Sequence, residues 1–290
     1  MSELLTHGGD WAGFLSERGK LPLDFSASIS PLGVPGGVRA AVRQAAGQMD
    51  RYPDPLCRAL RESISEYELV PPQQILCGNG AAELIFRVVW ALRPRQALVT
   101  APTFSEYGAA LQSVGCAVKT WSLPEKRDFR LEEGVLDAIT PETDLVFLCE
   151  PNNPTGVTAG RPLLLQILRR CRETGTRLVL DECFGDLLDD PESHTLKGEL
   201  EAYPNLLILK AFTKLYAMAG IRLGYALCAD RALLERMKIE HCYSAYYLPC
   251  RWRNVGLVCR VDEARRANAP LYGKLDWAGY YLLLGKMKRD

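Results

Sequence analysis

The sequence predicts an α/β protein built on a mainly parallel β-sheet with helices on both faces. Two observations lead to this fold class. From residue 75 onward, short apolar runs of strand length alternate with segments of helical spacing. Several of these runs, such as 145–149, are apolar almost throughout, which is typical of parallel strands that are buried on both faces. The chain has 290 residues, 48 % of them apolar, which is enough for one large core and a smaller lobe.

The expected elements follow in order along the chain. Residues 1–34 are mostly irregular with one short helix-like piece, and helical spacing recurs at 38–49 and 56–68. The expected strands are residues 75–77, 97–100, 118–123, 145–149, 177–180, 206–212 and 223–228. The expected helices between them are residues 81–92, a segment ending near 113, residues 163–172, and a segment that starts near 231.

These elements suggest three parts. We expect residues 1–34 to form an N-terminal segment that belongs to a small domain, and residues 35–235 to form the large domain. Residues 236–290 would form a C-terminal lobe, although the stretch 241–266 is rich in cysteine, arginine and tryptophan and has no clean period of 2 or 3.6.

Composition limits the classes of function. Lysine plus arginine and aspartate plus glutamate number 35 each, so the formal net charge is zero, which argues against a nucleic-acid partner or a membrane-binding basic face. No apolar run is long enough to span a membrane, and the N-terminus lacks a signal-peptide pattern. The ten cysteines are scattered without CxxC pairs, and Cys77, Cys149 and Cys228 lie in apolar runs. We therefore expect a cytoplasmic protein with reduced, buried thiols and no metal site.

Polar residues stand where several expected strands end. Because the carboxyl ends of parallel strands share one edge of the sheet, these residues should lie close together. Each also has an ordinary explanation when it is taken alone: a surface lysine or arginine, a turn or capping carboxylate, a proline turn, a core ring, or a plain glycine turn. The candidates are Lys214, Arg222, Asp181, Asn153, Phe104 and the pair Gly80-Ala81 at the start of a helix.

One cofactor, pyridoxal phosphate, would use all these features. It needs a lysine for a Schiff base, a carboxylate that keeps its pyridine nitrogen protonated, and a donor to its phenolic oxygen. It also needs a flat face to stack on and a site for a dianion. The protonated ring is an electron sink for the carbanion that forms when a bond at the substrate α-carbon breaks. Lys214 could then move protons.

The motifs resemble those of a known family. Pro-Asn-Asn-Pro-Thr-Gly at 151–156, Asp181-Glu182, Thr213-Lys214 and Gly-Ile-Arg-Leu-Gly-Tyr at 220–225 are similar to the motif set of the class I/II aminotransferase superfamily, which has fold type I and depends on pyridoxal phosphate. The resemblance covers about residues 22–238. Within the superfamily the chain most resembles the threonine-phosphate decarboxylases of cobalamin biosynthesis, which share the early His-Gly-Gly at 7–9. Histidinol-phosphate aminotransferases share several of the other motifs.

The resemblance implies a role for each candidate residue. Lys214 would form the Schiff base, Asp181 would pair with the pyridine nitrogen, and Asn153 would donate to the phenolic oxygen. Phe104 would stack on the ring. The remaining implied contacts are Gly80, Ala81, Thr213 and Arg222 with the cofactor phosphate, Tyr52 of a second subunit with the same phosphate, and His7 with the phosphate of the substrate. Tyr52 in this role implies a homodimer. The resemblance also implies that the substrate is a small phosphorylated amino acid.

The sequence also departs from the family pattern. Glu150 precedes the 151–156 motif where a neutral residue is more usual, and a carboxylate there would be costly unless it is paired or solvated. Phe184 stands where many aminotransferases have a tyrosine. Residues 281–284 resemble a strand that an arginine follows in the family, but Gly285 stands in its place, so we expect a C-terminally truncated lobe.

Three functions remain open at this stage. The resemblance favours decarboxylation of L-threonine O-3-phosphate to (R)-1-aminopropan-2-yl phosphate, which truncation could impair. A histidinol-phosphate-type aminotransferase is the second possibility. The third is a non-catalytic remnant that binds pyridoxal phosphate without turnover, because charge-assisted contacts to the substrate carboxylate would be missing.

Overall fold

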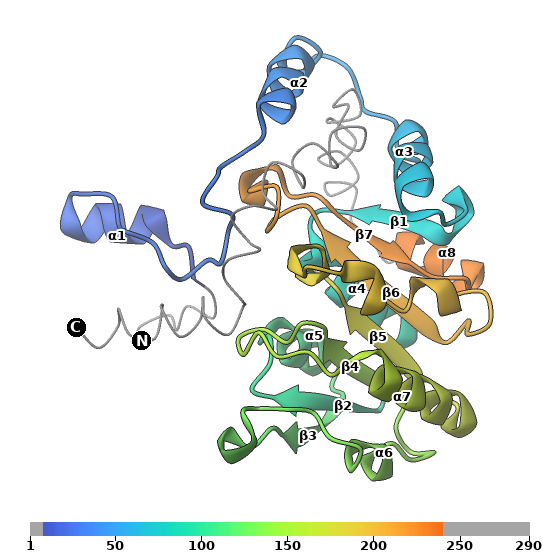
Figure 1. Cartoon of the computed structure of the whole chain (residues 1–290). Coiled ribbons are helices and arrows are strands. Elements are labelled where there is room, and N and C mark those ends of the chain that lie inside the picture. Colours follow the sequence, from blue (N-terminus) through green and yellow to red (C-terminus); the bar gives the residue numbers. More distant parts are fainter. Residues whose placement is uncertain (1–7, 240–290) are drawn as a thin grey trace.

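The computed structural model describes residues 8–239, which form a seven-stranded sheet covered by helices (Figure 1). The strand order is β1-β7-β6-β5-β4-β2-β3. The strands are β1 (Ile75–Gly78), β2 (Gln96–Ala101), β3 (Ala117–Ser122), β4 (Leu145–Cys149), β5 (Arg177–Asp181), β6 (Leu206–Ala211) and β7 (Gly224–Leu227). Among these strands, β7 runs antiparallel to both of its neighbours, β1 and β6, and all the other neighbouring pairs are parallel. The predicted fold class, a mainly parallel sheet, is therefore confirmed.

The helices in the described range also agree with the sequence pattern, with ends that differ by a few residues. They are α1 (Trp11–Arg18), α2 (Gly36–Ala46), α3 (Arg58–Glu68), α4 (Ala81–Leu92), α5 (Glu106–Ser113), α6 (Val135–Ala138), α7 (Arg161–Thr174) and α8 (Arg231–Ile239). Helix α6 was not expected, because a single turn is too short to show a helical period. Helix α1 lies at one side of the sheet in Figure 1 and is the helix-like piece of the N-terminal segment.

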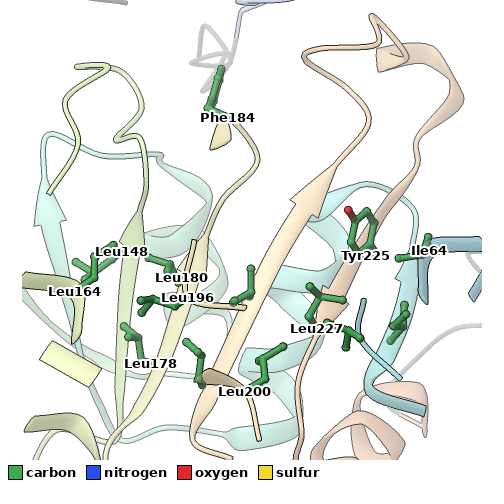
Figure 2. Close-up of a cluster of buried hydrophobic side chains, with 14 of the residues drawn as sticks. Ile64, Leu148, Leu164, Leu178, Leu180, Phe184, Leu196, Leu200, Tyr225 and Leu227 are labelled. Atoms are coloured by element: carbon green, nitrogen blue, oxygen red, sulfur yellow. The ribbon is translucent and has the colours of Figure 1, made fainter. Parts of the chain in front are cut away.

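The sheet separates two apolar layers. Leu206 and Ile208 of β6 belong to one buried cluster, together with residues of α2, α3 and α7 (Figure 2). Leu207 and Leu209 of the same strand belong to the other cluster, together with residues of α4, α5 and α8. Strand residues alternate between the two faces of a sheet, so a run that is apolar throughout fills both layers.

The sheet topology places the expected site residues along one edge. Strands β4 and β5 are in register with Cys149 opposite Asp181, and β6 and β7 are in register with Ala211 opposite Gly224. Because β7 runs in the opposite direction, its first residue lies beside the last residue of β6. The segments that follow β1, β4, β5 and β6 and the segment that precedes β7 therefore meet at the same edge.

The N-terminal segment reaches this edge as well. The backbone N–H of Ser30 donates to the carbonyl of Lys214 at 3.0 Å. His7 and nearly all of the predicted C-terminal lobe, residues 236–290, lie outside the described residues. Among the helices of the described range, none is both long and apolar enough to cross a membrane.

Candidate active site

Lys214 lies three residues beyond the end of β6 and is partly buried. Its Nζ donates to the carbonyl of Ala27 at 2.9 Å and lies 5.0 Å from the ring centre of Phe184. Burial lowers the pKa of the Lys214 amine, and the charge of Arg222 acts in the same direction, although Asp181 opposes it. A lysine with a lowered pKa is more readily the neutral amine that a carbonyl compound requires.

Asp181 is the last residue of β5 and only 4 % of its surface is exposed. One carboxylate oxygen, Oδ2, accepts from the hydroxyl of Tyr107 at 2.7 Å, and the other, Oδ1, accepts from the backbone N–H of Cys183 at 3.0 Å. The Tyr107 ring in turn stacks on Phe147 with centres 4.8 Å apart. Burial and the neighbouring Asp181 raise the pKa of Tyr107 far above its usual value, so its hydroxyl remains a donor.

The loop after β4 presents two asparagines with different roles. The Asn152 side chain is used within the protein: its Nδ2 donates to the carbonyl of Pro102 at 3.0 Å and to Thr155 Oγ1 at 2.9 Å, and its Oδ1 accepts from Thr103 Oγ1 at 3.0 Å. The Asn153 side chain makes no hydrogen bond within residues 8–239. Asn152 therefore fixes the loop, whereas the Asn153 amide is available to a ligand.

The start of α4 is shaped to accept an anion. Gly80 is the N-cap residue with φ +81°, and it has no side chain to cap the first amides of the helix. A Cβ on Gly80 would lie 2.6 Å from Arg222 Nη2, and a Cβ on Gly224 would lie 2.7 Å from the backbone nitrogen of Ala81. Gly224 is thus required for the close approach of β7 to this helix end, and the positive φ of Gly80 favours glycine at the N-cap. Arg222 Nη2 also donates to the carbonyl of Asn79 at 3.4 Å.

The other predicted site residues are placed as follows. Phe104 makes an edge-to-face contact with Tyr107 at 5.6 Å and so lies near Asp181. Thr213 directly precedes Lys214 and is half-buried. Tyr52 lies between α2 and α3 and is 88 % exposed.

Glu150 is paired within the fold, which answers the difficulty that the sequence raised. The residue is 2 % exposed, and its carboxylate accepts from the backbone N–H groups of Ala159 at 2.8 Å and Gly160 at 3.4 Å. Burial nevertheless raises its pKa to about 7. The same structure confirms that Cys77, Cys149 and Cys228 are buried free thiols. Cys57, in contrast, is disulfide-bonded, so the expectation of reduced thiols does not hold for every cysteine.

Tyr107 and Ala27 are the site residues whose contacts could not be inferred from the sequence. The bond from Tyr107 to Asp181 joins residues 74 positions apart. Ala27 contributes a backbone carbonyl, which carries no residue-type signal at all.

The donor set fits pyridoxal phosphate. A buried amine, a buried carboxylate, an unused amide donor and a glycine-lined helix start beside an arginine are the groups this cofactor requires. Asn79 Oδ1, next to the helix start, is buried and has no hydrogen-bond partner among residues 8–239, so the site has unused polar capacity.

Comparison with known proteins establishes the family. Residues 22–242 match the family model for aminotransferase class I and II, so the chain belongs to this family of pyridoxal-phosphate-dependent enzymes. A threonine-phosphate decarboxylase of Salmonella typhimurium is 40 % identical over 235 residues, which cover 80 % of this chain and 64 % of that protein. A histidinol-phosphate aminotransferase of Desulfitobacterium hafniense is 38 % identical over 208 residues, which cover 69 % of this chain and 56 % of that protein.

The solved structures agree on the fold. The histidinol-phosphate aminotransferase of Clostridium acetobutylicum superposes with a TM-score of 0.75 and 26 % identity, and the match covers 84 % of this chain and 71 % of that one. The chain spans less than two thirds of the length of the two sequence relatives described above.

Proposed function

We propose that this protein is a pyridoxal-phosphate-dependent decarboxylase that converts L-threonine O-3-phosphate to (R)-1-aminopropan-2-yl phosphate. The observation that carries the proposal is the partly buried Lys214 amine at the sheet edge, which donates to the Ala27 carbonyl at 2.9 Å, in a chain that is 40 % identical to a threonine-phosphate decarboxylase. Another relative, described as an adenosylcobalamin biosynthesis bifunctional protein, is 33 % identical over 225 residues and supports a role in cobalamin biosynthesis.

Each residue of the site has a task in this proposal. Lys214 binds the cofactor covalently, Asp181 faces the pyridine nitrogen, Asn153 donates to the phenolic oxygen and Phe104 stacks on the ring. The phosphate is held by Gly80, Ala81, Thr213 and Arg222, joined by Tyr52 of a second subunit. His7, which lies outside the described residues, contacts the phosphate of the substrate.

The chemistry divides between cofactor and protein. When bound, pyridoxal phosphate withdraws electrons from the substrate α-carbon. Tyr107 and the Cys183 amide donate to the two oxygens of Asp181 and so hold its carboxylate in the position from which it would face the pyridine nitrogen. Lys214, with its lowered pKa, accepts and returns a proton at Nζ. Burial of these groups keeps water from competing for them.

A histidinol-phosphate-type aminotransferase is the second candidate. It is favoured by the relative from Desulfitobacterium hafniense and by the structural neighbour from Clostridium acetobutylicum. The two reactions differ in which bond at the α-carbon breaks, and therefore in the requirement for a 2-oxo acid acceptor, which only transamination consumes.

The experiment begins with cofactor binding. Purified protein incubated with pyridoxal phosphate should gain a visible absorption band that resists dialysis, and Lys214→Ala should lose it. Lys126→Ala, which changes an exposed lysine, is the matched control and should keep the band. A band that is equally stable in Lys214→Ala would contradict the assignment of Lys214.

The second stage identifies the reaction. The loaded protein is given O-phospho-L-threonine, and carbon dioxide and the amine product are measured with and without a 2-oxo acid. Release of carbon dioxide without a 2-oxo acid supports the decarboxylase. Consumption of histidinol phosphate that depends on a 2-oxo acid supports the aminotransferase, and a stable band without either reaction supports a non-catalytic protein.

Three further features complete the proposal. We propose a cytoplasmic homodimer in which Tyr52, exposed in a single chain, reaches the cofactor phosphate of the second subunit. We also propose the division into an N-terminal segment (1–34), a large domain (35–235) and a shortened C-terminal lobe (236–290). Sedimentation measurements on the wild type and on Tyr52→Ala, with cofactor affinity as the second readout, test the shared site.

A further inference from the structure

Glu150 joins the two ends of the loop that carries Asn153. Its backbone N–H donates to the carbonyl of Asp181 at 2.8 Å, so the residue is fixed at the sheet edge. Its carboxylate accepts from the backbone N–H groups of Ala159 at 2.8 Å and of Gly160 at 3.4 Å. Gly160 is the residue before α7, so one buried side chain closes the whole segment 151–160.

Backbone hydrogen bonds hold the loop on both sides of Asn153, whose side chain is partly exposed. The Asn152 backbone N–H donates to the carbonyl of Val157 at 2.9 Å, and the Asn152 carbonyl accepts from Gly156 N–H at 2.6 Å. A small pocket lies against the far end of the loop and is lined in part by Glu150, Val157 and Ala159. Side chains therefore do not completely fill the space beside Val157 and Ala159, and the hydrogen bonds of Glu150 help to hold the loop in position.

A second segment contacts the same carboxylate. His194 Nδ1 lies 3.5 Å from Glu150 Oε1. The two residues after His194 are held by Glu182, whose carboxylate accepts from Thr195 Oγ1 at 2.8 Å and from Leu196 N–H at 3.1 Å. Glu150 and Glu182 thus both contact the segment 194–196, but only Glu150 binds the Ala159 and Gly160 amides.

We propose that Glu150 is a positioning residue that places Asn153 in the site by binding the Ala159 and Gly160 amides. This inference rests on the proposed function, because Asn153 has its task only when the cofactor is bound. A carboxylate can accept both amides at once and forms stronger bonds than a neutral acceptor. A neutral carboxamide at this position offers one oxygen, so it loses one of the two bonds and places an NH₂ group against a donor.

The first test needs no cofactor. Amide hydrogen exchange is measured in the wild type, Glu150→Gln and Glu182→Gln. In Glu150→Gln, exchange at Ala159, Gly160 and Asn152 should become at least about tenfold faster, which corresponds to about 1.4 kcal/mol of lost protection. Glu182→Gln is the matched control and should affect Leu196 while leaving Gly160 unchanged. Unchanged exchange in the loop of Glu150→Gln would overturn the proposal.

The second test connects the loop with Asn153. The pH at which the visible band of the bound cofactor changes is measured for Glu150→Gln, Asn153→Ala and the double variant. If Glu150 acts through Asn153, Glu150→Gln shifts this pH in the same direction as Asn153→Ala, and the double variant matches Asn153→Ala alone. Fully additive shifts would contradict the proposal.

The two tests separate the possible failures. A wild-type protein that binds no pyridoxal phosphate contradicts the proposed function, while the exchange measurement still decides whether Glu150 holds the loop. If Glu150→Gln does not fold, Glu150→Asp keeps the charge but shortens the reach, and the same increase in exchange at Ala159 and Gly160 is expected.

Discussion

Glu68 and Glu150 are both almost fully buried, with 1 % and 2 % of their surface exposed, yet their pKa values are displaced in opposite directions. Burial by itself raises the pKa of both carboxyl groups. In Glu68, on α3, nearby lysines overcome this effect and lower the pKa below 4.5. In Glu150, backbone amides are the principal compensation, and the pKa rises to about 7.

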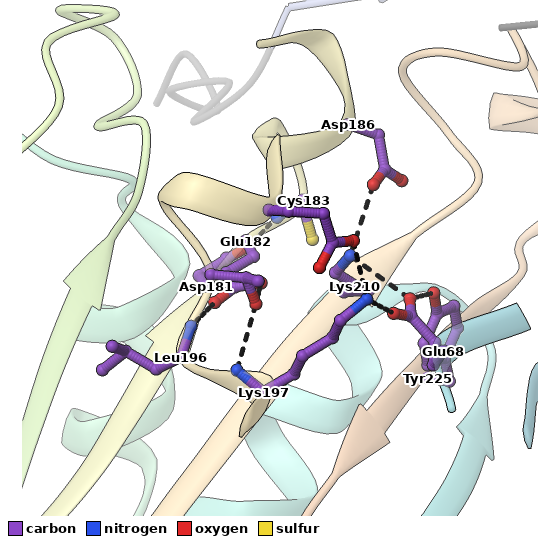
Figure 3. A network of polar contacts seen from close by, with 11 residues as sticks. Glu68, Asp181, Glu182, Cys183, Asp186, Leu196, Lys197, Lys210 and Tyr225 are labelled. Carbon is purple, nitrogen blue, oxygen red and sulfur yellow. Dashed lines mark hydrogen bonds and ion pairs between the residues drawn. The ribbon is translucent and has the colours of Figure 1, made fainter. Parts of the chain in front are cut away.

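The difference lies in the partners. Lys210 Nζ lies 3.2 Å from Glu68 and 3.3 Å from Asp186, and Lys197 Nζ lies 3.4 Å from Glu68 (Figure 3). The hydroxyl of Tyr225 donates to the same carboxylate. Figure 3 also shows Glu182 bonded to Leu196 close to this network. Ion pairs thus join α3 to the sheet, whereas backbone amides that donate to a buried carboxylate hold the loop of the site.

Removal of the central cation should have the largest effect on this comparison. Lys210→Met leaves Asp186 and one oxygen of Glu68 buried without their main partner, so the free energy of unfolding should fall by about 3–5 kcal/mol. Urea unfolding measures it. Lys197→Met, which removes the outer lysine, is the control and should cost clearly less. Equal losses in the two variants would mean that Lys210 does not organise the network.

The hydrogen bond from the Tyr107 hydroxyl to the Asp181 carboxylate lies on the other side of the sheet from the Glu68 network and can be tested by mutation. Tyr107→Phe keeps the ring on Phe147 but removes the donor to Asp181, so we expect a loss of about 1.5–3 kcal/mol in urea unfolding. Tyr203→Phe changes a buried tyrosine whose hydroxyl makes no hydrogen bond within residues 8–239, and should be nearly neutral. A loss of similar size in both variants would show that the bond to Asp181 is not the cause.

The two carboxylates should give pH dependences of opposite sign. The folded state holds the Glu150 proton more tightly than the unfolded chain, so this contribution is complete below pH 4.5 and is lost as the pH rises to about 7. In Glu150→Gln, the free energy of unfolding should no longer fall by up to about 1.4 kcal/mol per pH unit between pH 4.5 and about 7 on account of this residue. Glu182, with a pKa also near 7, retains its own decline in this variant.

Glu68→Gln provides the counterpart. Because the pKa of Glu68 is lowered, its contribution is present above pH 4.5 and is lost as the pH falls through its pKa in the folded state. When unfolding is measured from pH 3 to 8, the free energy of unfolding of Glu68→Gln should lack the decline at acidic pH that the wild type shows. The same change of slope in both variants would refute the assignment of opposite signs.

A partly exposed ion pair should have the smallest effect. Arg161 and Glu199 are 2.6 Å apart, with 35 % and 25 % of their side chains exposed. Glu199→Gln should lower the free energy of unfolding by about 0.2–1 kcal/mol, and less at high salt. A loss as large as that of Lys210→Met would mean that burial does not distinguish the two kinds of ion pair.

Most of the fold was predictable because its signals are local. The apolar runs 145–149 and 206–212 and the glycines that surround the start of α4 can be read without knowledge of distant contacts. One-turn helix α6 could not be predicted, because a single turn shows no period. The bond from Tyr107 to Asp181 and the contact of Lys214 with Ala27 join residues far apart in the sequence, so no local pattern encodes them.

The sequence by itself determined the fold class, the family and the residues that gather at one edge of the sheet, because alternating strands and helices leave little choice of topology. The tertiary structure decided what each buried charge does. Glu150 looked like an unfavourable carboxylate in the sequence and became an acceptor that closes a loop, whereas Glu68 gained two lysines. The physical reason is that burial sets the cost of a charge, while the partners that repay it come from distant parts of the chain.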